Sequence, residues 1–73
     1  MYQINYMIGK RFGLDYYAEV DELQTNLLNS VGEKYKTWNW WYANNKTLVI
    51  NFVLERDYIW FVMKYAGTGV LRS

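Results

Sequence analysis

Apolar side chains recur along this chain with two different spacings. The two-residue alternation is typical of strands with one buried face, and it covers residues 2–8, 14–20, 35–43, 47–54 and 58–65. A glycine lies at each end of residues 9–13, which predicts a turn and an N-terminal hairpin between the first two strands. Leu23, Leu27 and Val31 instead follow the three- and four-residue spacing of a helix.

The expected helix spans residues 22–31. Asp21 is a suitable N-cap, with Gln24 three residues later as in a capping box, and Gly32 suits the position after the last turn. A competing interpretation starts the helix at Asp15, because Tyr16 also fits the helical spacing. The strand over residues 14–20 is preferred here, since its alternation is regular.

The resulting fold class is α+β, a single small domain with the order β-β-α-β-β-β. The strands form an antiparallel sheet with the helix packed on one face, and residues 44–46 make a hairpin connection. With 73 residues there is room for one core only. We expect residues 1–66 to form the domain and residues 67–73, which contain Gly67 and Gly69, to form a flexible tail.

One helix can cover only one face of this sheet, so the other face meets water, a second copy or a partner. Alternation places Trp41, Tyr58 and Trp60 on that open face, and Trp and Tyr are enriched in binding hot spots. A register slip of one residue would exchange the two faces. The residues expected to bind a partner are Trp41, Tyr58, Trp60, Arg56, Lys64 and Tyr17.

Composition restricts the chemistry. The chain has no His and no Cys, which removes the usual catalytic bases, thiol nucleophiles, disulfides and thiolate zinc sites. Asp21 and Glu22 are a weak signal for a hard cation because no loop framework surrounds them. We therefore expect no enzymatic activity, no catalytic residue, no cofactor and no metal.

The formal net charge is only +1, which is weak evidence for any strongly charged partner. Acidic residues nevertheless gather before and within the expected helix, where they form either a docking surface for a basic partner or a solvated helix N-terminus. These residues are Asp15, Glu19, Asp21 and Glu22. No apolar run is long enough to cross a membrane, and no signal peptide is evident, so we expect a cytoplasmic protein.

The expected function is a non-enzymatic protein-binding module that uses an aromatic sheet face. One alternative is a single-stranded nucleic-acid-binding protein that stacks bases on Trp41, Tyr58 and Trp60. Another is a homodimeric structural or adaptor protein. In its size, its Tyr, Trp and Asn content and its lack of Cys, the chain resembles small anti-defence proteins of phages, such as anti-CRISPR proteins. That resemblance implies inhibition by stoichiometric blocking of a host or defence complex.

Overall fold

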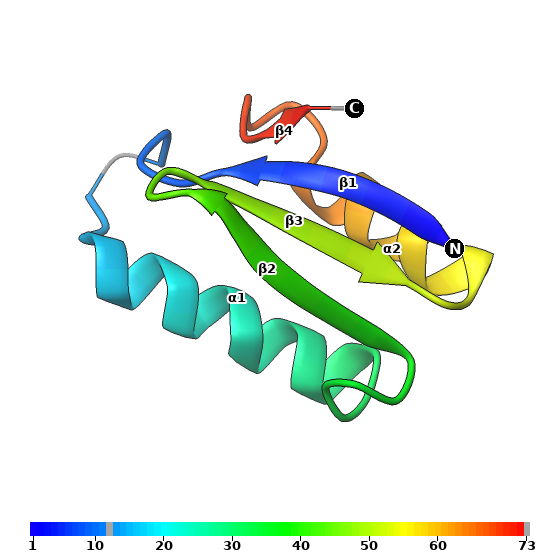
Figure 1. Ribbon diagram of the computed structural model, residues 1–73. Coiled ribbons are helices and arrows are strands. Elements are labelled where there is room, and N and C mark those ends of the chain that lie inside the picture. The colour runs from blue at the N-terminus through cyan, green and yellow to red at the C-terminus, as the bar shows by residue number, and fades with distance from the viewer. Residues whose placement is uncertain (12, 73) are drawn as a thin grey trace.

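The computed structural model describes residues 1–11 and 13–72 and shows an α+β fold (Figure 1). This confirms the predicted fold class, although two helices are present where one was expected. The elements in chain order are β1 (Tyr2–Met7), α1 (Tyr16–Ser30), β2 (Trp38–Asn44), β3 (Thr47–Phe52), α2 (Glu55–Tyr65) and β4 (Leu71–Arg72).

The four strands form an antiparallel sheet in the order β2-β3-β1-β4. The predicted hairpin between β2 and β3 is confirmed, and its turn is closed by the Asn44 carboxamide oxygen, which accepts a hydrogen bond from the Lys46 N–H at 2.8 Å. The hairpin places β3 at the centre, paired with β2 on one side and β1 on the other. One long edge of the sheet therefore belongs to β2.

The strand predicted over residues 14–20 is wrong, because α1 begins at Tyr16. The Asp15 side chain accepts a hydrogen bond from the Ala18 N–H at 2.8 Å, so Asp15 is the N-cap and Asp21 lies inside the helix. The end of the helix is as predicted. Gly32 has φ of 135° and its N–H donates to the Leu27 carbonyl at 3.1 Å, a backbone conformation that favours glycine.

The strand predicted over residues 58–65 is also wrong, because these residues belong to α2. Phe61 and Tyr65 are buried at a spacing of four, while Ile59 and Met63, which a strand would place on the same face as Phe61, are exposed. A short apolar run fits a buried strand and a helix equally well. The charges at its two ends favour the helix, with Glu55 in the first turn and Lys64 in the last.

Both helices pack on the same face of the sheet, around Tyr6 of β1. The Tyr6 ring lies 5.5 Å from the Tyr65 ring and 6.4 Å from the Phe61 ring, and its hydroxyl reaches Glu19 of α1. Along β2 the alternation is visible, since Trp38 and Trp40 are buried and Trp41 is exposed. The buried side chains of the sheet include Ile4, Tyr6, Trp38, Trp40, Leu48, Ile50 and Phe52. The opposite face carries neither helix.

The C-terminal segment, expected to be a flexible tail, returns to the sheet. Val70 is fully buried in the core, and Leu71 and Arg72 pair with Tyr6 and Asn5 as β4. Of this segment, Ser73 lies outside the described residues, as does Phe12 of the turn before α1.

We predict that Leu27→Ala destabilises the domain by about 2–5 kcal/mol, because it opens a cavity where a fully buried side chain stood. Leu28→Ala is the matched control, since Leu28 is the next residue and is exposed. Urea unfolding followed by tryptophan fluorescence measures both. Equal losses of stability in the two variants would contradict the helical face assigned to α1.

Candidate functional site

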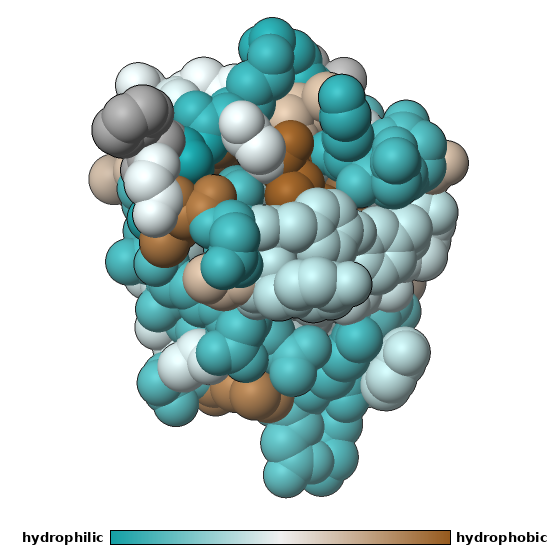
Figure 2. Space-filling model, turned by 90° about the vertical axis from the view of Figure 1, so that its left-hand side faces the viewer, coloured by the Kyte–Doolittle hydropathy of each residue, from teal (hydrophilic) through white to brown (hydrophobic). Residues whose placement is uncertain are grey.

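A groove lies between the first half of α1 and the end of β2. It has a volume of about 640 Å³. We call it the acidic tyrosine groove. Its lining residues are Asp15, Tyr16, Tyr17, Ala18, Val20, Asp21, Gln24 and Tyr42. Figure 2 looks onto this end of the molecule, and side chains of intermediate hydropathy, the class of Tyr and Trp, gather near the middle of the view.

The tyrosine rings of the groove are held by the start of α1. Because Asp15 caps the helix, Tyr16 and Tyr17 occupy its first turn, with their rings edge to face at 5.5 Å. Tyr17 is 82% exposed and Tyr42 is 47% exposed. Burial and then hydrogen bonding with Tyr16 raise the pKa of Tyr42, so the Tyr42 hydroxyl keeps its proton at ordinary pH. The tyrosine rings thus give the groove an aromatic wall.

The charged residues of the groove are both acidic. One carboxylate oxygen of Asp15 accepts the hydrogen bond that caps the helix. Asp21 is exposed, and it takes part in none of the ion pairs found among residues 1–11 and 13–72. No basic side chain lines the groove. Uncompensated carboxylates beside exposed ring faces are suited to a cationic group.

The six residues expected to bind a partner are distributed over several surfaces. Tyr17 lines the acidic tyrosine groove. Trp41 is 51% exposed on β2, where the register pairs it with Val49 and turns it toward the face without helices. Tyr58 and Trp60 are half-buried on α2, on the other side of the sheet. The three rings expected to stack bases therefore do not share one face.

The remaining two residues, Arg56 and Lys64, flank Trp60 on α2 at a spacing of four residues. The Lys64 ammonium lies 5.9 Å from the centre of the Trp60 ring, and the Arg56 side chain is 83% exposed. Arg56 and Lys64 therefore lie on the same helix as Trp60, one on each side of it in the sequence. The three residues form a helical stripe, and Trp41 is not part of it.

Sequence reasoning missed Tyr16, Tyr42 and Gln24 as residues of the acidic tyrosine groove. A usable signal existed in the competing helix that starts at Asp15. In that helix Tyr17, Asp21 and Gln24 are spaced by four and three residues and so share one face. The position of Tyr42 opposite this face comes from the tertiary fold, which no local pattern reports.

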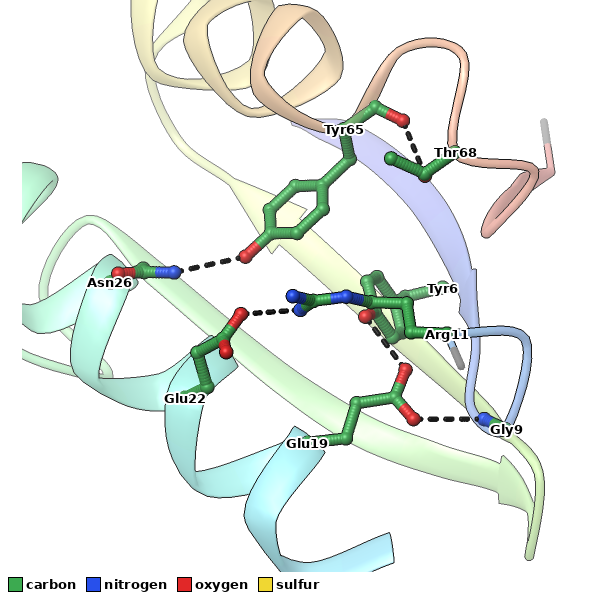
Figure 3. A network of polar contacts seen from close by, with 8 residues as sticks. All are labelled: Tyr6, Gly9, Arg11, Glu19, Glu22, Asn26, Tyr65 and Thr68. Atoms are coloured by element: carbon green, nitrogen blue, oxygen red, sulfur yellow. Dashed lines mark hydrogen bonds and ion pairs between the residues drawn. The ribbon is translucent and has the colours of Figure 1, made fainter. Parts of the chain in front are cut away.

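A second group of polar side chains lies between α1 and the N-terminal turn (Figure 3). Glu19 is fully buried, and both of its carboxylate oxygens are bonded. One accepts from the Tyr6 hydroxyl at 2.8 Å and the other from the Gly9 N–H at 3.0 Å. Arg11 pairs with Glu22. These carboxylates hold Gly9 and Arg11 to the helix.

The same network extends to α2. The Asn26 carboxamide donates to the Tyr65 hydroxyl at 3.1 Å, and the Thr68 hydroxyl donates to the Tyr65 carbonyl at 2.7 Å. Figure 3 shows these side chains reaching across from α1 to the end of α2. The contacts tie the two helices to each other, which indicates a structural role for this region.

Within residues 1–11 and 13–72, no group of three or more acidic side chains is placed to hold a metal ion. None of the described helices combines the length and the apolar character that crossing a membrane requires. Comparisons of the chain with protein-family models, with curated proteins and with solved structures give no match.

We predict that Tyr6→Phe lowers the free energy of unfolding by about 1–3 kcal/mol, because it leaves a buried Glu19 oxygen without its donor. Tyr17→Phe is the control and should be neutral, since the Tyr17 side chain is exposed. Chemical denaturation measures both variants. A Tyr6→Phe protein as stable as the parent would mean that this bond contributes nothing.

We also predict that stability falls at alkaline pH. Burial, and then the hydrogen bond to Glu19, raise the pKa of Tyr6, and burial raises that of Tyr65. The unfolded chain thus releases these protons above pH of about 10, while the folded chain retains them. Below that pH the contribution is constant, and above it unfolding becomes easier by up to about 1.4 kcal/mol per pH unit and proton.

Urea unfolding between neutral and alkaline pH tests this dependence. Lysines titrate in the same range, so the informative quantity is the difference between the parent and Tyr6→Phe. The variant should lose stability less steeply. Identical slopes would show that the Tyr6 pKa is not raised by folding.

Proposed function

We propose that this protein is a non-enzymatic protein-binding module whose acidic tyrosine groove receives a basic segment of its partner. The observation that carries the proposal is the lining of the groove, where tyrosine rings and two carboxylates meet without any basic residue. A Lys or Arg side chain supplies the complementary charge and an aliphatic stem that packs on the rings.

The energetics favour a cationic side chain over other ligands. A cation over an aromatic ring contributes about 0.5–2 kcal/mol, with the larger values where water is excluded. Asp21 adds an attraction that salt screens, because the groove is open to solvent. Phosphate groups are repelled by the same carboxylates, so the groove does not favour a nucleic acid.

The mode of action we propose is stoichiometric blocking. A binding domain that covers a basic segment of a partner prevents that segment from making its normal contacts, and it needs no catalytic group. The composition, which resembles that of small phage anti-defence proteins, agrees with this mode. An inhibitor of a host or defence complex is therefore the more specific form of the proposal.

The test uses a short peptide of alternating Lys and Thr as the probe, with binding measured by calorimetry at low salt. Tyr17→Ala and Asp21→Asn should each weaken binding by roughly 2- to 30-fold, the equivalent of one lost cation contact. The matched controls are Tyr35→Ala and Glu33→Gln, which alter an exposed ring and an exposed carboxylate outside the groove.

The control variants should bind the peptide as the parent does. A peptide of alternating Glu and Thr should not bind. If the acidic peptide binds equally well, or if the control variants weaken binding as much as the groove variants do, the groove is not a site for basic segments.

A further inference from the structure

Beyond Trp38, the outer edge of β2 lacks the usual protection against strand pairing. β2 is the terminal strand of the sheet, and its seven residues, Trp38–Asn44, include no charged residue and no proline. Exposed edge strands in natural proteins are normally guarded by charges, prolines or covering elements. Lys34 covers the start of this edge, through a bridge to Trp38 and with its ammonium 5.0 Å from the centre of the Trp40 ring. The stretch from Trp40 to Asn44 is the part suited to receive another strand.

The backbone groups at this edge can be assigned from two hydrogen bonds. The Thr37 carbonyl accepts from the Val53 N–H at 2.9 Å, so residue 37 points toward β3, while the Trp38 carbonyl accepts from the Tyr35 N–H at 2.6 Å on the other side. Direction alternates along a strand. The N–H and C=O groups of Trp40 and Tyr42 therefore point outward.

These outward groups have no protein partner in the part of the chain that the structure describes. No backbone hydrogen bond from outside the sheet reaches Trp40 or Tyr42 among residues 1–11 and 13–72. Backbone donors and acceptors at a sheet edge supply most of the affinity when an extended peptide adds to a sheet.

The acidic tyrosine groove adjoins this edge, because Tyr42 belongs to both. Its ring lines the groove opposite α1, while its backbone forms part of the free edge. An added strand would turn every second side chain to the same face of the sheet, at a spacing of roughly 6.5–7 Å. Side chains on the α1 side of such a strand would lie over Tyr16, Tyr17 and Asp21.

We propose that the basic segment of the partner binds in extended form, as an additional strand on the free edge of β2. Its backbone bonds to Trp40 and Tyr42, and its alternate Lys or Arg side chains enter the acidic tyrosine groove. This inference rests on the proposed function and specifies the conformation of the bound segment. The backbone hydrogen bonds supply affinity, and the carboxylates of the groove favour positively charged side chains.

The carboxylates beside this edge favour a basic partner strand over a second copy of the protein. A second copy pairing through its own β2 would offer Trp38–Asn44, which contains no cation to enter the groove. Such a pairing would also bring two copies of Asp15 and Asp21 toward each other. The edge is therefore complementary to a basic strand and not to itself.

The experiment compares the Lys/Thr peptide with two derivatives, one N-methylated at every Lys and one at every Thr. In an added strand, either the Lys residues or the Thr residues direct their backbone N–H groups toward β2, and the other residues direct theirs away from the protein. One derivative should thus bind at least about 10-fold more weakly, for loss of about two backbone hydrogen bonds, and the other should bind like the parent peptide.

Amide hydrogen exchange locates the bound strand on the protein. The peptide should slow exchange at Trp40 and Tyr42, whose N–H groups are free. The amides of Asn39 and Trp41 point toward β3 and serve as internal controls. Unchanged exchange at Trp40 and Tyr42 in the peptide complex would overturn the proposed strand addition.

The remaining outcomes separate the two proposals. If both methylated peptides bind as the parent does, the segment is not an added strand, while the groove still captures basic side chains. If the Glu/Thr peptide binds as well as the Lys/Thr peptide, the proposed function itself fails. Protection of Trp40 and Tyr42 in a peptide-free dimer would show that a second copy takes the edge, contrary to this inference.

Discussion

The buried carboxylate of Glu19 is the interaction on which the rest of the molecule depends. A carboxyl group without solvent contact requires hydrogen-bond partners, and Glu19 obtains them from the Tyr6 hydroxyl and the Gly9 N–H. These bonds connect α1 to β1 and to the turn that follows it. They also fix the rotation of the helix. Because each residue turns the helix by about 100°, an inward Glu19 directs Tyr17 and Asp21, two positions away on either side, to the opposite face.

The aromatic content serves both the core and the surface. In the core, Tyr6, Phe61 and Tyr65 form pairs with centroid separations from 4.8 to 6.4 Å, which lets a small domain bury large side chains without disulfides. Tyr17 and Trp41 remain exposed and belong to different faces. The aromatic side chains thus form one core and separate surface groups, and the group at the start of α1 is combined with the carboxylates of Asp15 and Asp21.

The sequence could identify the elements whose apolar pattern had a single interpretation. β1 and the β2–β3 hairpin were predicted because long alternations were bounded by turn residues. Residues 14–20 fit both the two-residue period of a strand and the spacing of a helix. The hydrogen bond from the Ala18 N–H to the Asp15 side chain stabilises the helix, and composition does not reveal this bond. Residues 58–65 were too short for periodicity to separate strand from helix. The acidic tyrosine groove needed Tyr42 beside α1, a contact between distant segments that local patterns cannot supply.

The open part of the β2 edge is able to pair with unrelated extended chains, and the carboxylates of the adjacent groove restrict which chains bind there. Free N–H and C=O groups on an uncharged strand attract any extended chain, including another copy of this protein. Native proteins usually place charges on the edge strand itself, which blocks all partners alike. Here the carboxylates of Asp15 and Asp21 lie beside the strand on α1, so they repel acidic strands and attract basic ones. Because Glu19 sets the rotation of α1, the bond that stabilises the core also positions the charges that discriminate between strands at the edge.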